Sequence, residues 1–340
     1  MRKWLIILGL LMCLAGGLAY WGYQLIFAPA VQLNGQENME FHVPTGQTFD
    51  RLIAELAEAT GITPSALNQV AGFMKFDQAK PGRYIIEEGM STKSLLSRFR
   101  SGNQEAVNLT FNNVRMIENL AAVISKKVES DSLTLLEYFT DERTLEKYKV
   151  TREQVLTLFV PNTYKIYWNS SPEKIVERLY KERQKFFNTE RQSKAEKLGL
   201  TTEEVYTLAS IVEKETLVRD EKPRVAGVYI NRLKRGQLLQ ADPTVVYANK
   251  QFDIKRVLNK HLEYDSPYNT YIYEGLPPGP IYMPDVHSID AVLDYERHKY
   301  LYFCAAPDNS GRHQFARTLV EHNRNANKYR AFLNRNRIYR

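Results

Sequence analysis

The hydrophobic and polar positions divide the chain into an apolar N-terminal stretch and a long region of mixed strand and helix patterns. From Trp4 to Phe27 no residue is charged. At about 1.5 Å per helical residue, this stretch can cross the roughly 30 Å hydrocarbon core of a bilayer. The pattern therefore predicts a transmembrane helix over residues 4–27, between a short tail (residues 1–3) and a linker (residues 28–40).

The positive charges around this helix predict its orientation. Arg2 and Lys3 precede it, and no Lys or Arg follows until Arg51. The positive-inside rule places the tail in the cytoplasm and the remainder on the other side of the inner (cell) membrane, in the periplasm or the extracytoplasmic space.

A cleaved signal peptide is the alternative interpretation of this helix. The apolar run is longer than a typical signal core of about 7–15 residues. Tyr20, Trp21 and Tyr23 are typical of an interfacial aromatic belt rather than of a cleavage site. A retained, single-pass anchor is the prediction.

Residues 41–104 predict a small α/β subdomain with the order strand, helix, helix, strand. An alternating strand leads through Pro-Thr-Gly into a helix with Phe49, Leu52 and Leu56 at helical spacing. Thr63 and Pro64 predict the start of a second helix, and "PGRYII" returns as a strand. This order resembles the lysin motif, which binds the sugar backbone of peptidoglycan or chitin; a generic α/β subdomain is the alternative.

Residues 105–190 predict a second α/β scaffold region. The strand, turn and amphipathic helix that begin near Leu109 repeat the pattern that begins at Phe41. "LFVPNTYKIYW", residues 158–168, predicts a strand–turn–strand or an extended loop, because Pro-Asn interrupts its apolar run.

A helix within residues 191–340 carries two glutamates, in "LASIVEKETL". At 100° per residue, Glu213 and Glu215 point about 200° apart, so they cannot have the same role. Glu215 is in register with Leu208, Ile211 and Val212 on the apolar stripe. Glu213 shares its side with Tyr206, Ala209 and Ser210, which predicts a more exposed position.

The position of Glu215 is typical of a general acid. Burial favours the neutral carboxyl and raises its pKa, as proton donation near neutral pH requires. The alternative is a structural glutamate paired with Lys214, Arg219 or Arg224.

Composition and charge exclude several other functions. The chain of 340 residues is 44% hydrophobic and 25% charged, which is ordinary for globular domains. Its net charge of +7 suggests anionic lipid or a wall polymer outside the membrane rather than nucleic acid. Cys13 lies in the predicted span and Cys304 beyond it, so no intramolecular disulfide is expected, and no cysteine or HExxH cluster predicts a metal or another cofactor.

Several motifs resemble one family in the order in which it carries them. They are "ASIVEKET", "VxINRLxxGxxLQxDPTVxY", "YNTYxxxGLPPGPI", "YLYF" and "HxF…HN", between about Leu208 and Asn323. Together they are similar to the endolytic murein transglycosylases, the YceG-like family. Asn162 in "FVPNTY" stands where the family usually has Asp, so that carboxylate is not expected to be essential.

The resemblance implies roles for individual residues. Glu215 corresponds to the catalytic glutamate, with Glu213 supporting or structural. A glycan groove is implied for residues that continue these motifs: Gln240, Asp242, Thr244, Tyr268, Asn269, Thr270 and Tyr271. Support around the groove is implied for Asn231, His313, Phe315, His322 and Asn323, although packing or capping is an equal alternative for the two histidines.

The family resemblance also implies an activity. A lyase of this kind cleaves the MurNAc–GlcNAc β-1,4 bond of nascent peptidoglycan, leaves 1,6-anhydro-MurNAc ends and limits strand length, with peptidoglycan synthases as partners. The alternatives are a muramidase that uses Asp242 as its second carboxylate, and a scaffold that binds the wall without catalysis. The expected fold is α+β: a transmembrane helix, a small lysin-motif-like subdomain and a C-terminal mixed α+β catalytic domain with helices on a mixed sheet.

Overall fold

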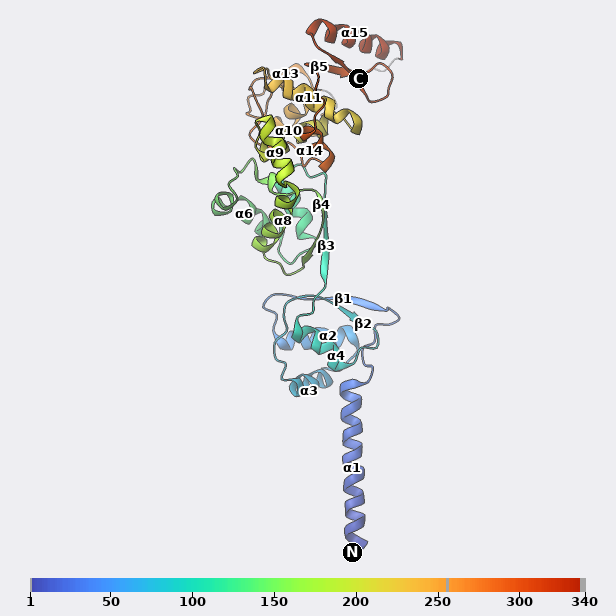
Figure 1. Cartoon of the computed structure of the whole chain (residues 1–340). Coiled ribbons are helices and arrows are strands. Elements are labelled where there is room, and N and C mark those ends of the chain that lie inside the picture. The colour runs from blue at the N-terminus through green and yellow to red at the C-terminus, as the bar shows by residue number, and fades with distance from the viewer. Residues whose placement is uncertain (1, 255–256, 337–340) are drawn as a thin grey trace. The chain divides into compact units, whose positions relative to one another are not determined.

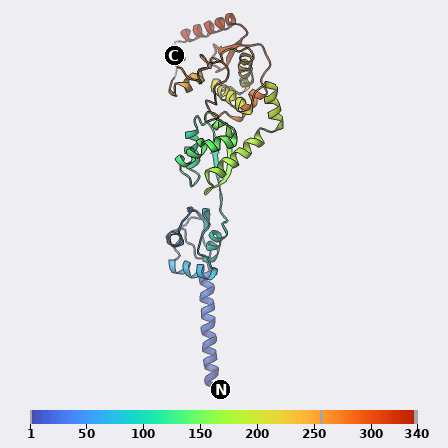
Figure 2. The same ribbon diagram turned by 90° about the vertical axis from the view of Figure 1, so that its left-hand side faces the viewer.

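The computed structural model describes residues 2–254 and 257–336, which form two compact units. The N-terminal unit holds the chain up to Asn108 together with Lys127–Ser130 and Lys165–Ser171. The C-terminal unit holds Leu109–Lys126, Asp131–Tyr164 and the chain from Pro172 onward. Figures 1 and 2 show the elements of each unit from two sides.

The N-terminal unit begins with a long apolar helix and continues as a small α/β subdomain. Its elements are α1 (Arg2–Phe27), β1 (Asn38–Val43), α2 (Phe49–Thr60), α3 (Pro64–Met74), β2 (Gly82–Glu87) and α4 (Thr92–Ser101). The predicted order strand, helix, helix, strand is confirmed. Lys3–Phe27 is apolar and long enough to cross a membrane, a test that signal sequences also pass.

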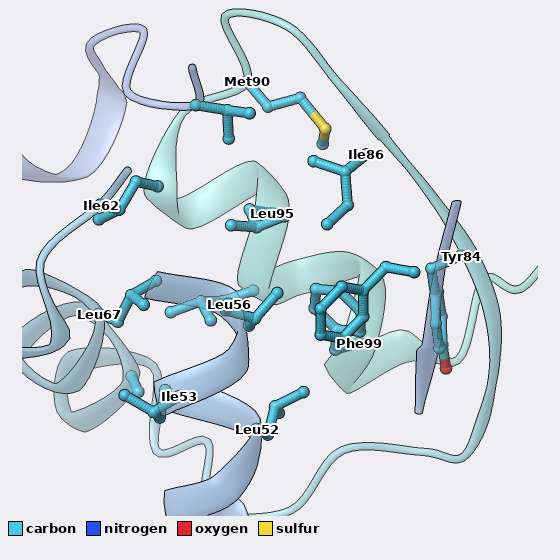
Figure 3. Close-up of a cluster of buried hydrophobic side chains, with 14 of the residues drawn as sticks. Leu52, Ile53, Leu56, Ile62, Leu67, Tyr84, Ile86, Met90, Leu95 and Phe99 are labelled. Carbon is cyan, nitrogen blue, oxygen red and sulfur yellow. The ribbon is translucent and has the colours of Figure 1, made fainter. Parts of the chain in front are cut away.

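The core of this subdomain forms between its helices and its two-stranded sheet. β1 and β2 pair antiparallel, from Asn38 opposite Glu87 to Val43 opposite Gly82. Figure 3 shows the buried side chains that converge there from α2, α3, β2 and α4, among them Leu56, Leu67, Tyr84 and Phe99. The apolar spacing that predicted the first helix marks its buried face.

The segment between α1 and β1, predicted as a linker, is irregular but firmly held. Val31 and Leu33 belong to the buried core. The amides of Ala30 and Val31 donate to the carbonyl oxygen of Met90, at 3.1 and 3.0 Å. Leu25 and Ile26, in the last turn of α1, also pack against this core. The end of α1 is therefore part of the folded subdomain.

The C-terminal unit is mainly helical. Two strands, β3 (Ala106–Phe111) and β4 (Asn162–Tyr167), pair with each other and carry the chain between the units. The first helices are α5 (Ile117–Ser125), α6 (Ser132–Thr140), α7 (Glu142–Tyr148), the 3₁₀ turn η1 (Val155–Leu158), α8 (Pro172–Phe186) and α9 (Thr189–Leu198). The remaining elements are α10 (Thr202–Glu215), η2 (Arg219–Glu221), α11 (Lys222–Leu233), α12 (Asp242–Ala248), α13 (Asn259–Leu262), α14 (Val286–Leu293), β5 (Tyr302–Ala305), β6 (His313–Ala316) and α15 (Leu319–Arg335).

Helix α10 is the central element of this unit. It packs against α9, α11, α12 and α14, and its residues from Val205 to Val212 are all buried. In contrast, α15 has no buried residue and rests on β5 and β6. Both views show α15, in red, at the periphery of the unit (Figures 1 and 2).

The α+β class is confirmed, but the predicted mixed sheet is wrong. In the part of the chain that the structure describes, the strands form three separate two-stranded sheets, and β5 pairs antiparallel with β6. The segment 158–168 begins at the end of the 3₁₀ turn and contains one strand, β4, rather than a strand–turn–strand. The motif "YNTY" is a series of turns, because the Asn269 side chain bonds to nearby backbone.

Candidate active site

Helix α10 delivers both glutamates from a well-capped start. The Thr201 hydroxyl accepts from the amide of Glu204, and the Glu204 carboxylate accepts from the amide of Thr201, which together form a capping box. The helix ends at Glu215, and Thr216 continues in extended conformation. Glu215 therefore lies where a buried helix reaches the surface of a groove.

The Glu215 carboxyl group is held by a tyrosine and has an unusually high pKa. The Tyr229 hydroxyl, on α11, donates to Glu215 Oε1 at 2.7 Å. Burial raises the pKa of Glu215 to about 7, and the negative charge of Asp242 adds to this; the Tyr229 hydrogen bond and Arg232 act in the opposite direction. The predicted desolvated carboxyl group is confirmed.

Glu213 is the glutamate that forms a structural ion pair. Lys222 Nζ lies 2.7 Å from Glu213 Oε2, and the Ser288 hydroxyl donates to the same oxygen at 2.5 Å. Lys222 and Ser288 are buried. The predicted exposed face is wrong, since its members Tyr206, Ala209 and Ser210 are fully buried against neighbouring helices.

Two cavities meet at Glu215. The wide cavity, about 800 Å³, is bordered by Arg115, Lys214, Val246, Phe252, Ile281 and Tyr329. The narrow cavity, about 280 Å³, is bordered by Tyr229, Arg232, Gln240, Tyr271, Tyr302 and His322. Glu215 and Asp242 line both. The acid thus lies within a groove that continues on either side of it.

Three of the predicted groove residues lie beside Glu215. Asp242 begins α12, and its carboxylate accepts from the Tyr271 hydroxyl at 2.6 Å. Gln240 has a positive φ of 49°, and its amide donates to the Thr270 carbonyl oxygen at 3.0 Å. This left-handed residue turns the chain so that Asp242 faces the groove.

Three others, Thr244, Asn269 and Thr270, do not line the groove, because they are buried. The Thr244 and Thr270 hydroxyls are 2.8 Å apart. Asn269 Nδ2 donates to the carbonyl oxygens of Leu262 and Tyr264, at 2.9 and 2.8 Å. These side chains hold the "YNTY" turns against α12 and so position Tyr271.

Tyr268 lies farther along the groove. It borders a third cavity, the far cavity, of about 280 Å³, together with Arg115, Tyr247 and Phe252. Its ring centroid is 4.7 Å from that of Tyr247. Because Arg115, Tyr247 and Phe252 also line the wide cavity, the far cavity extends it.

Three of the predicted supporting residues act away from Glu215. Asn231 Nδ2 donates to the carbonyl oxygens of His298 and Tyr300, both at 2.9 Å. His313 Nδ1 lies 3.0 Å from Glu221 Oε2. The Phe315 ring packs against Tyr300, at a centroid distance of 5.7 Å. They fix the strands β5 and β6 to α11 and η2.

Of the last two, His322 reaches the groove and Asn323 does not. His322 borders the narrow cavity, and its ring lies 5.5 Å from that of Tyr302. Burial, together with Arg232, lowers the pKa of His322, which favours a neutral ring. Asn323 is exposed on α15.

The sequence did not identify several residues as part of the groove, although Lys214 and Arg232 lie within the quoted motifs. Tyr229 and Arg232 come from the inner face of α11, and their role depends on how α11 packs on α10. Arg232 Nε donates to the Leu301 carbonyl oxygen at 2.7 Å. Arg115 and Lys214 border the wide cavity from elements far apart in sequence. Helical periodicity describes one element at a time, so it could not identify them.

The site holds no metal-ligand set. Over residues 2–254 and 257–336, no three His, Cys, Asp or Glu side chains are grouped so that they could hold a metal ion.

Known proteins are similar to this chain over most of its length. The chain is 28% identical over 334 residues to the endolytic murein transglycosylase of Bacillus subtilis (strain 168), covering 92% of this chain and 90% of the relative. It is 25% identical over 350 aligned positions to the endolytic murein transglycosylase of Streptococcus pneumoniae serotype 2 (strain D39), covering 92% of this chain and 62% of the relative.

A solved structure and a family model agree with these relatives. The crystal structure of a yceG-like protein from Listeria monocytogenes matches with 27% identity and a TM-score of 0.56, over 85% of this chain and 99% of that one. The model of the YceG-like family matches residues 41–328. The resemblance inferred from the motifs is confirmed, and the chain belongs to the YceG-like family.

Proposed function

We propose that this chain is a membrane-anchored endolytic lytic transglycosylase that cleaves the MurNAc–GlcNAc β-1,4 bond of peptidoglycan and leaves 1,6-anhydro-MurNAc ends. The observation that carries the proposal is Glu215: a carboxyl group with a pKa of about 7, bonded to Tyr229, inside a groove that continues on both sides. Relatives named endolytic murein transglycosylases support the substrate.

One carboxyl group is sufficient for this reaction. Protonated Glu215 donates its proton to the glycosidic oxygen as the bond from C1 of MurNAc breaks. The carboxylate then takes the proton of the MurNAc C6 hydroxyl as that oxygen bonds to C1. The proton is returned, no water is consumed, and the product is an internal acetal in which O6 has replaced the leaving oxygen on C1. A pKa near 7 suits both steps, because neither form of Glu215 is strongly favoured at neutral pH.

The two cavities beside Glu215 support cleavage within a glycan strand rather than at its end. A strand that fills the narrow cavity and the wide cavity passes Glu215 without having to end there. Tyr271 and Tyr302 on the narrow side offer aromatic faces against which pyranose rings can pack.

A muramidase remains the second candidate, because Asp242 lines both cavities with Glu215. In that mechanism Asp242 would act on water or on C1, and the product would be a reducing end. Asp242 is already bonded by Tyr271, which favours a supporting role.

We also propose that α1 is a retained anchor, with its N-terminus in the cytoplasm and the rest of the chain outside. Leu25 and Ile26 pack on the core of the N-terminal unit, and a cleaved signal peptide would remove them from a folded domain. An anchored enzyme acts near the membrane, where synthases release new strands; limiting their length is the proposed role. The lysin-motif-like subdomain, residues 41–104, would hold glycan.

The test is a pair of variants of the full chain in detergent micelles. Glu215→Gln should lower the release of soluble fragments from peptidoglycan by roughly 10²–10⁴-fold, because it removes the general acid. Glu196→Gln makes the same change at an exposed position on α9 and should have no effect. Full activity of Glu215→Gln would refute the catalytic assignment, and a wild-type chain that binds strands without cutting them would establish the scaffold alternative.

A further inference from the structure

The wall of the wide cavity carries more cations than carboxyl groups. Arg115, Lys214 and Arg330 border it, against the carboxyl groups of Glu215 and Asp242. Burial raises the pKa of Glu215 to about 7, so this carboxyl group carries less than a full negative charge near neutral pH, and Asp242 is left as the main anion of the wall. The cavity therefore favours an anion.

Arg115 and Lys214 are held in place by aromatic rings rather than by ion pairs. The Arg115 guanidinium carbon lies 4.0 Å from the centroid of the Phe252 ring, and Lys214 Nζ lies 4.5 Å from that of Tyr282. Such contacts fix a cation and leave its N–H donors free. Within the described parts of the chain, no carboxylate is within 4.0 Å of either group, including Glu118 and Glu153 of the far cavity.

The two cations also affect each other. Burial lowers the pKa of Lys214 and the charge of Arg115 lowers it further, whereas the charge of Glu213 acts in the opposite direction. Two like charges on one cavity wall disfavour each other until an anion lies between them. Arg330, in contrast, donates to Asn327 of its own helix at 2.8 Å, so it is the less available of the three.

We infer that Arg115 and Lys214 bind a carboxylate of the substrate strand in the wide cavity, beside the sugar that is being cut. This inference rests on the proposed function and specifies its substrate class: murein strands that carry acidic groups, rather than neutral β-1,4 glycans. The wide cavity has room for such a group, since its volume of about 800 Å³ far exceeds the 280 Å³ of the narrow cavity.

Two parts of murein can supply the carboxylate. Stem peptides carry carboxylates when they are attached to the lactyl group of MurNAc. If the peptide has been removed, the lactyl group itself ends in a free carboxylate. A guanidinium and an ammonium group recognise either one by charge-assisted hydrogen bonds, so the probes must separate the two sources.

The test measures binding by the full chain in detergent micelles, with Glu215→Gln as background so that bound strands are not cut. The probes are strands with stem peptides, strands from which an amidase has removed the peptides, and chitohexaose, which has the same β-1,4 backbone and no carboxylate. Arg115→Gln and Lys214→Gln are compared with Arg115→Lys, and with Lys181→Gln at an exposed position on α8 as the matched control.

The inference predicts that Arg115→Gln and Lys214→Gln each raise the dissociation constant of one acidic probe about tenfold or more, which is about 1.4 kcal/mol. They should leave the dissociation constant of chitohexaose unchanged, Arg115→Lys should recover part of the affinity, and Lys181→Gln should have no effect. The acidic probe that is affected identifies the source of the carboxylate.

Equal weakening for all three probes, or none for either acidic probe, would overturn the inference. Its failure is distinguishable from failure of the proposed function, because binding is read without cleavage. Wild-type chain that cuts strands, with variants that bind like the parent, would refute only the carboxylate site. If the Arg115 and Lys214 variants bind an acidic probe more weakly and chitohexaose equally well, but the wild type cuts no strands, only the proposed activity would be refuted.

Discussion

At the scale of residues, the balance around Glu215 explains how one carboxyl group can act first as an acid and then as a base. Burial and Asp242 favour its protonated form, while Tyr229 and Arg232 favour the ionised form. The resulting pKa of about 7 leaves both forms accessible.

This balance predicts the pH profile of the wild type. The first step needs protonated Glu215, so kcat/KM should fall as the pH rises through about 7, the pKa of the free enzyme's acid. The profile is measured by the initial rate of fragment release from peptidoglycan. A rate that is constant from pH 6 to pH 8 would contradict the assignment.

Two variants should move this falling limb in opposite directions. Tyr229→Phe removes a hydrogen bond that lowers the pKa of Glu215, so the limb should move to higher pH. Asp242→Asn removes a charge that raises that pKa, so the limb should move to lower pH. Each variant should keep activity within about a hundredfold of the wild type, because the general acid remains.

The same pair distinguishes the two mechanisms. If Asp242 were the second carboxylate of a muramidase, Asp242→Asn would lose activity at every pH, as Glu215→Gln does. If the falling limbs of the pH profiles of Tyr229→Phe and Asp242→Asn moved in the same direction, the two substitutions would be disturbing the fold rather than the pKa of Glu215.

The sequence predicted the surroundings of Glu215 better than those of Glu213. Apolar residues recur at helical spacing along α10, and Glu215 continues this stripe. Glu213 was expected to be exposed because its helical face is less apolar. Its partners, Lys222 on α11 and Ser288 on α14, are 9 and 75 positions away, and only the packing of three helices brings them together.

At the scale of elements, the Glu213–Lys222–Ser288 cluster fixes α10 to α11 and α14. The Lys222 side chain is only 6% exposed and that of Glu213 is 15% exposed. Removing one partner of a buried pair leaves the other charge without compensation.

Lys222→Met should therefore lower the free energy of unfolding of the C-terminal unit by about 3–5 kcal/mol. Urea unfolding of the full chain measures this, with the loss of peptidoglycan cleavage reporting the unfolding of the unit that carries Glu215. Arg178→Gln breaks the more exposed pair with Glu182 on α8 and should cost at most about 1 kcal/mol. Equal stability of the two variants would show that the cluster does not hold the helices.

The Gly-Pro loop before α14 is the second structural support of the site. Its Ile281 amide donates to the buried Ser210 hydroxyl on α10 at 3.0 Å. A side chain at Gly279 would place its Cβ 2.0 Å from the carbonyl oxygen of Glu153. Only glycine allows this approach.

Gly279→Ala should therefore shift the loop, weaken the Ile281–Ser210 contact and lower both the unfolding midpoint and the activity. Gly72→Ala is the control, since a Cβ there meets nothing within 4 Å in helix α3, and it should be neutral or slightly stabilising. A Gly279→Ala chain with wild-type activity and midpoint would contradict this account of the loop.

Element order was largely predictable, and sheet architecture was not. The capped starts of α3 and α10 follow from Thr63 and Thr201, which act within a few residues of themselves. The turns around Asn269 have a strand-like composition, yet bonds to Leu262 and Tyr264 hold them as turns. Whether strands join one sheet or three depends on distant partners that composition does not specify.

At the scale of the whole molecule, the two compact units do not coincide with the predicted regions. Residues 105–190 and 191–340 were expected to be separate, but most of both lie in the C-terminal unit. Apolar patterns locate helices; they do not show which helices share a core. The N-terminal unit, in contrast, packs its subdomain against the end of α1 through Leu25 and Ile26.

If α1 is a membrane anchor, releasing the enzyme from the membrane should change how it acts on the wall. If α1 is replaced by a cleaved signal peptide, the enzyme should no longer be restricted to strands near the membrane, and the strand-length distribution of the wall should change. Chromatography of strands after amidase treatment measures it, with an anchored Glu215→Gln chain as the control. An unchanged distribution, at equal protein level and activity, would count against a role for the anchor.

Digestion of peptidoglycan in ¹⁸O-labelled water, followed by mass spectrometry, tests directly whether Glu215 drives cleavage without water. Product ends should be 1,6-anhydro-MurNAc, lighter than a reducing end by one water molecule and free of ¹⁸O, and Glu215→Gln should make no such ends. Reducing ends that carry ¹⁸O, or anhydro ends made by Glu215→Gln, would contradict this role of Glu215.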